Sequence, residues 1–162
     1  LTDKDGSLVE RVINVTVANP TTPLAMEKTG EIYHVGGSLK GSWDLVADLA
    51  KGASDPAADK DIRNKDIAGD PFTGSFNNTN NTMFVKSNSF DYMNATEESA
   101  MAAYAAGTPS ATVTNPAVGD MYIAKIRGGN TYMVIKIATL DPADNTCNCG
   151  NRGKMTFTYK KN

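Results

Sequence analysis

Alternating apolar and polar residues open the chain. Residues 7–17, SLVERVINVTV, alternate between two faces, and this period of two predicts a β-strand. The DKDG sequence before it favours a turn, and ANPTTP after it predicts an extended linker. One face of the predicted strand is strongly apolar and holds Val9, Ile13, Val15 and Val17, with Arg11 as its charged member.

The same alternation is strongest in the last third of the chain. Residues 119–127 and 130–140 flank a GGN turn, and residues 154–160 add a third alternating run. Three consecutive antiparallel strands form a meander, which we expect to be the stable centre of the fold. Shorter apolar runs predict further strands at residues 82–87 and in GEIYHVGG and SWDLVADLA, the last two as a hairpin-like unit.

Two segments have helical signals instead. In ASDPAADKDIRNKD, Ser54 is a suitable N-cap and Ile62 a single apolar anchor, so we expect a short polar helix. In NATEESAMAAYAAG, Thr96 is a suitable N-cap and Gly107 a suitable end. The i, i+3, i+4 spacing predicts that this second helix turns Met101, Tyr104 and Ala105 toward the core.

These elements predict a mainly β fold, an antiparallel sheet or sandwich with a C-terminal three-stranded meander and two short helices. Residues 1–20 would form an N-terminal strand and linker, and residues 21–162 a β-rich globular domain. A chain of 162 residues is long enough for one such domain and an additional element.

Composition narrows the class of protein. The chain is 21% charged with a formal net charge of −2, and much of the polar remainder is Asn, Thr, Ser and Gly, which suits a secreted protein. It has no run of basic residues, so nucleic acid is not an expected partner. It also has no apolar run of the length that a membrane span requires. We therefore expect an extracellular location or the outer surface of a bacterium.

Catalytic groups are scarce in the sequence. His34 is the single histidine, and no nucleophile elbow, phosphate-binding loop or H-E-x-x-H motif occurs. The acidic residues between Asp55 and Asp70 are interleaved with Lys60, Arg63 and Lys65, a pattern typical of a solvated helix face. We read His34 as a structural or surface residue and expect no enzyme activity.

Metal and cofactor sites are not expected either. Asp3 and Asp5 resemble the start of a calcium loop whose later ligands are missing. Cys147 and Cys149 supply two of the four ligands that zinc prefers, and we interpret TCNCGN as a hairpin tip with free or locally paired thiols. For a small ligand, the possible contact aromatics are Tyr33 and Trp43.

Two resemblances add to this interpretation. The segment LTDKDGSLVERVINVTV resembles the closing strand of immunoglobulin-like or PKD-like modules of bacterial surface proteins. The segments GSWDLV, FVKSNSFDYMNATEE, VGDMYIAKIRGGNTYMVIKI and MTFTYKK are similar to C-terminal domains of secreted proteins and lipoproteins of Bacteroidota. SWDLV and the final meander also resemble HmuY-like lipoproteins, which implies haem held by paired axial side chains, whereas this chain has one histidine.

The first strand leaves three possibilities for pairing. It could complete a sheet of a preceding module, fold back on its own domain, or enter a groove on a neighbouring subunit by donor-strand complementation. The leading hypothesis is a non-enzymatic extracellular structural or interaction protein, including a filament subunit assembled through this strand. Its partners would be copies of itself or other surface proteins. The alternative is a secreted ligand-binding module for carbohydrate or haem.

Overall fold

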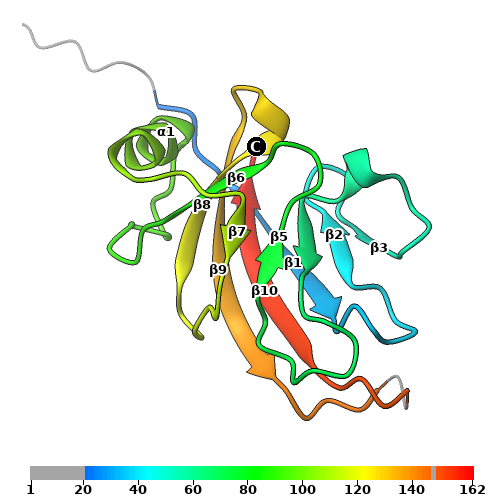
Figure 1. Cartoon of the computed structure of the whole chain (residues 1–162). Helices are drawn as coiled ribbons and strands as arrows, with labels where there is room; N and C mark the ends of the chain where they lie inside the picture. The colour runs from blue at the N-terminus through cyan, green and yellow to red at the C-terminus, as the bar shows by residue number, and fades with distance from the viewer. Residues whose placement is uncertain (1–20, 147–148) are drawn as a thin grey trace, which may run out of the picture.

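The computed structural model describes residues 21–146 and 149–162. In this part of the chain, ten strands form two five-stranded antiparallel sheets, and one α-helix packs on the first of them (Figure 1). The strand order is β1-β10-β9-β8-β6 in the first sheet and β3-β2-β4-β5-β7 in the second. The predicted mainly β, sandwich-like fold is confirmed.

The first sheet contains the predicted C-terminal meander. Strands β8, β9 and β10 are consecutive neighbours in the sheet, and each pair is antiparallel. The β8–β9 connection is the 3-10 turn η2 (Ile126–Gly128), in which Arg127 has a positive φ of 51°. The strands of this sheet are β1 (Met26–Tyr33), β6 (Met83–Lys86), β8 (Met121–Lys125), β9 (Tyr132–Asp141) and β10 (Lys154–Lys161).

The second sheet is built from short strands and corrects two expectations. GEIYHVGG and SWDLVADLA do not form a hairpin-like unit, because β1 and β2 lie in different sheets. The polar helix expected from Ser54 is only the 3-10 turn η1 (Ala57–Asp59), and Ile62 begins a strand that pairs with Trp43. Its strands are β2 (Ser42–Asp44), β3 (Leu49–Lys51), β4 (Ile62–Asn64), β5 (Phe76–Asn77) and β7 (Thr112–Val113).

Helix α1 (Glu97–Ala106) begins and ends where the sequence predicts. Thr96 and Ser99 form a reciprocal capping box, and Gly107 follows the last turn. The buried face is only partly the expected one, because Tyr104 packs toward the core as predicted while Met101 and Ala105 do not. Met101 is 50% exposed and Ala105 is also exposed, whereas Ala100 is buried and Ala103 and Tyr104 pack beside it. Gly107 lets the end of the helix approach β6 closely, because a Cβ atom there would collide with Val85.

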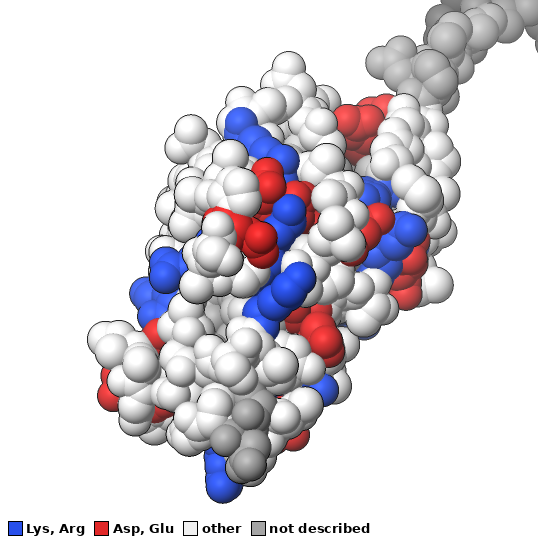
Figure 2. Space-filling view, turned by 90° about the vertical axis from the view of Figure 1, so that its right-hand side faces the viewer, with Lys and Arg blue, Asp and Glu red and all other residues white. Residues whose placement is uncertain are grey.

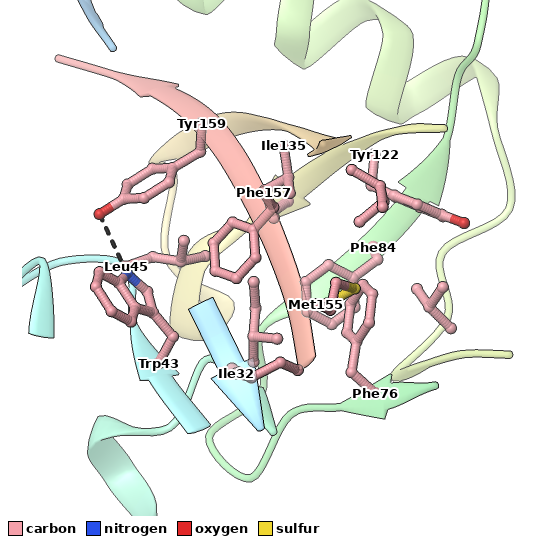
Figure 3. Packing of buried hydrophobic residues seen from close by; sticks show 14 of the residues in the cluster. Ile32, Trp43, Leu45, Phe76, Phe84, Tyr122, Ile135, Met155, Phe157 and Tyr159 are labelled. Carbon is pink, nitrogen blue, oxygen red and sulfur yellow. Dashed lines mark hydrogen bonds between the residues drawn. The ribbon is translucent and has the colours of Figure 1, made fainter. Parts of the chain in front are cut away.

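Two apolar cores hold the layers together. The larger core lies between the sheets, where the indole N–H of Trp43 donates to the hydroxyl of Tyr159 over 3.2 Å (Figure 3). The smaller core lies between the first sheet and the helix, and its members are Leu24, Tyr92, Ala95, Ala100, Ile123, Tyr132 and Val134. Since Leu24 belongs to this second core, the chain just before β1 is fixed on the helix side of the sheet.

Candidate functional site

Residues 22–24 are held against the start of α1. The Leu24 N–H donates to the Ala95 carbonyl over 2.9 Å, and the Glu97 N–H donates to the Thr22 carbonyl over 2.8 Å. The Thr22 N–H also donates to Glu98 Oε2 over 2.9 Å. Figure 1 shows this segment leaving β1 and running to α1, which packs on β8 and β9. Thr22 and Leu24 are thus held beside α1, on the face of the first sheet that the helix covers.

The side of β1 opposite β10 is an open sheet edge within the described residues. In residues 21–146 and 149–162, β10 is the single pairing partner of β1. The His34 N–H donates toward β10, to the Gly153 carbonyl, while the Tyr33 N–H donates away from it, to the Lys40 carbonyl. Because main-chain groups alternate in an antiparallel ladder, Glu27, Thr29 and Glu31 also direct their N–H and C=O groups away from β10. In the described part of the chain, these groups have no hydrogen-bond partner on that side.

Exposed apolar side chains lie at the same corner. Lys161, which is opposite Met26 in the register, donates from Nζ to the Val46 carbonyl over 2.9 Å. Lys28 Nζ lies 3.6 Å from Asp48 Oδ2, and this ion pair brings the turn between β2 and β3 beside β1. Met26, Val46 and Leu49 are 46%, 49% and 55% exposed. We call these three residues the corner patch, and exposed apolar groups beside an open edge are typical of an interface.

The sequence analysis predicts four interface residues, all in the N-terminal strand. Val9, Ile13, Val15 and Val17 lie outside the described residues. The structure fixes the position of Thr22, to which residues 18–21 join their segment, beside α1. The open edge and the corner patch were not recognised from sequence, since GEIYHVGG alone does not reveal that β1 is the terminal strand of its sheet.

The two candidate ligand-contact aromatics have different environments. Trp43 is only 9% exposed, and its ring packs edge-on against Phe157 between the sheets. Tyr33 is half-buried, with its hydroxyl donating to Glu31 and Lys154 Nζ lying 5.7 Å from its ring centroid. Trp43 therefore offers no open face on which a sugar or porphyrin ring would stack.

His34 has a structural environment. It is buried, its Nδ1 accepts from the Gly36 N–H over 3.0 Å, and its Nε2 lies 3.0 Å from the Asp70 carbonyl. Since Nδ1 is an acceptor, Nε2 is the nitrogen that carries the proton and donates. A haem iron would have to displace one of these two hydrogen bonds to bind this ring.

A buried ion-pair cluster joins the two sheets. Arg127 donates through Nε and Nη2 to Asp61, over 3.0 and 2.9 Å, and through Nη2 to Asp44 over 2.7 Å. Asp61 also accepts from the Leu45 N–H, Asn80 and Thr82, so both carboxylate oxygens are engaged. The hydrogen bond with Asp61 raises the pKa of Arg127 further above its already high value. The expectation that Asp61 lies on a solvated helix face is wrong, because Asp61 is fully buried.

The described residues show no sign of a metal site or a membrane-spanning helix. The described residues contain no group of three or more His, Cys, Asp or Glu side chains arranged to hold a metal ion. Cys149 is disulfide-bonded, and Cys147 lies outside the described residues. In residues 21–146 and 149–162, no helix has the length and apolarity needed to cross a membrane. On the face shown in Figure 2, basic and acidic side chains are interspersed, as the near-neutral composition predicts.

The open edge of β1 and the adjoining corner patch, together with the attachment of residues 22–24, make up the candidate site. No protein-family model, curated protein or solved structure matches the chain.

Proposed function

We propose that this protein is a non-enzymatic structural protein of the bacterial outer surface, and that copies of it assemble through the N-terminal strand into a filament. The observation that carries this proposal is the open edge of β1, where the outward main-chain groups of Glu27, Thr29 and Glu31 have no hydrogen-bond partner within residues 21–146 and 149–162. A strand supplied from elsewhere can satisfy these groups.

The length of the linker permits pairing between subunits. Residues 18–21 separate the predicted strand from Thr22, and the five Cα–Cα steps from Val17 to Thr22 span at most about 18 Å when fully extended. This length allows the predicted strand to reach a neighbouring copy without requiring it to do so.

Chemistry also supports a structural role. His34, Asp44 and Asp61 are buried and use their polar atoms for hydrogen bonds within the fold. The disulfide at Cys149 is consistent with an oxidising compartment outside the cytoplasm. The resemblance of residues 1–17 to strands of bacterial surface modules favours the same location. A face with four β-branched residues would contribute roughly 1.5 to 3 kcal/mol per side chain if it were buried in a neighbour.

Two matched substitutions test the proposal. Ile13→Asp places a charge on the predicted buried face, and Val12→Asp places the same charge on the opposite face of the same strand. We expect Ile13→Asp and deletion of residues 1–18 to abolish polymers seen by electron microscopy and size-exclusion chromatography. Val12→Asp should still assemble, because its side chain faces away from the contact.

The result that contradicts the proposal is equally defined. A parent protein that stays monomeric at every concentration tested would exclude a filament subunit. Loss of folded structure on deletion of residues 1–18, detected by circular dichroism, would mean that the strand belongs to its own domain instead.

A further inference from the structure

We infer that the acceptor for residues 7–17 is the outer edge of β1 on a second copy of the chain, at Glu27, Thr29 and Glu31. This inference rests on the proposed function, and it identifies the surface that the N-terminal strand would bind. The two described sheets have four terminal strands, which are β1, β6, β3 and β7.

The edge of β6 is already occupied within the domain. Phe84 exchanges both of its outward main-chain hydrogen bonds with Ser110, each over 2.9 Å. Since β6 contains only four residues, this bridge leaves Lys86 as the single outward residue after it. A strand of eleven residues would find almost no ladder to extend at this edge.

The edge of β7 is short and also satisfied. β7 contains two residues, and the Thr112 N–H donates to Ser110 Oγ over 3.1 Å while that hydroxyl donates back to the Thr112 carbonyl over 2.7 Å. The groove between β6 and β7 has a volume of about 210 Å³ and is lined largely by hydroxyl side chains, among them Thr108, Ser110, Thr112 and Thr114. This lining does not suit a β-branched strand face.

The edge of β3 is limited by its length. β3 contains three residues, and only Ala50, opposite Trp43, directs its main-chain groups outward. Its carbonyl already accepts from Lys40 Nζ over 3.1 Å. By contrast β1 contains eight residues, of which Glu27, Thr29 and Glu31 present successive outward N–H and C=O groups.

The surroundings of β1 match the donor. The apolar face of residues 7–17 would have the corner patch of Met26, Val46 and Leu49 to cover, and backbone pairing would extend the first sheet by one strand. The charges on β1, at Glu27, Lys28 and Glu31, discourage unspecific pairing of this edge. A strand from another copy, delivered by a tethered linker, is therefore the occupant to which the edge is suited.

Proline substitutions distinguish β1 from the other edges. Thr29→Pro removes an outward N–H that makes no bond to β10, so the fold keeps its own ladder while the incoming strand is blocked. Ala50→Pro is the matched control, because it removes an outward N–H from the terminal strand β3. We expect loss of polymer with Thr29→Pro and normal assembly with Ala50→Pro, while both variants keep the circular dichroism spectrum of the parent.

Hydrogen exchange on the unmodified full-length protein provides a measurement that does not depend on variants folding. The amides of Glu27, Thr29 and Glu31 should exchange more slowly in the polymer than in dilute monomer, while the Ala50 amide should not change. Unchanged exchange at those three amides in a polymer, or normal assembly of a folded Thr29→Pro variant, would overturn the inference. If Ile13→Asp still abolished that polymer, the proposed function would be retained and the acceptor would be a surface other than β1. A parent protein that never assembles would contradict both the proposed function and this inference.

Discussion

Asp120 links three segments of the chain through one carboxyl group. It accepts from Lys86 Nζ over 2.7 Å, from Asn88 Nδ2 over 2.8 Å and from the Ala117 N–H over 2.9 Å. Burial alone would raise the pKa of Asp120, but these hydrogen bonds outweigh it and lower the pKa to about 2. The ionised form is therefore the one that the folded protein favours.

This shift predicts how stability depends on pH. Because the folded pKa lies below the unfolded one of about 3.9, the stabilisation is fully present above about pH 4 and is lost as pH falls toward 2. Asp120→Asn should lower the free energy of unfolding by about 2 kcal/mol at pH 7 and flatten its fall between pH 4 and pH 2. Urea unfolding at several pH values measures the free energy of unfolding. Asp70→Asn, which changes an exposed carboxyl group, is the control. If the free energy of unfolding fell equally between pH 4 and pH 2 in the parent and in Asp120→Asn, the lowered pKa of Asp120 would be contradicted.

Asp61 shows why some residues could not be assigned from sequence. Its neighbours Lys60 and Arg63 give the segment the alternating charges of a solvated helix. The residue that pairs with it is Arg127, 66 positions later in the turn between β8 and β9. A contact of that separation depends on how the two sheets pack, and no local pattern encodes it. The Thr96 cap was predictable because its partner, Ser99, is three residues away.

At the scale of elements, strong local periodicity was a reliable guide. The meander β8–β9–β10 and the ends of α1 follow directly from alternation and capping residues. The short strands of the second sheet do not, because strands of two or three residues are stabilised by their neighbours more than by their own sequence. In the same way, the open edge of β1 is a property of the sheet order, which depends on strands from distant parts of the chain.

The orientation of α1 gives a test at this scale. In an alanine-rich helix, Met101 is the obvious apolar anchor, yet the side that meets the sheet contains Ala100. Ala100→Leu should destabilise the protein by about 1 to 3 kcal/mol, because the added atoms have no room against β8 and β9. Met101→Ala should change stability by less than about 0.5 kcal/mol. Thermal unfolding of the two variants distinguishes the two helix faces. A larger destabilisation by Met101→Ala than by Ala100→Leu would favour the face expected from sequence.

For the whole molecule, the proposed donor and acceptor are different segments of the chain. The donor is residues 7–17, which are joined to the domain through Thr22 beside α1, and the acceptor is the outer edge of β1. Such a contact is heterologous, so each copy that binds one neighbour keeps a free donor or a free acceptor. The arrangement favours head-to-tail growth, with polymer length that rises with protein concentration.

Mixing two defective variants tests this arrangement directly. Ile13→Asp should lose the donor and keep the acceptor, whereas Thr29→Pro should keep the donor and lose the acceptor. Each variant alone should be monomeric. An equimolar mixture should form a one-to-one dimer and stop there, because the dimer has neither a working donor nor a working acceptor at its ends. Light scattering coupled to size-exclusion chromatography measures the mass of the complex.

Adding Ile13→Asp to the parent protein should also shorten its polymers, since this variant binds a free donor strand and ends growth there. A mixture that stays monomeric would show that the two substitutions do not act on complementary halves of one contact, and long polymers in the mixture would show that a second contact drives assembly.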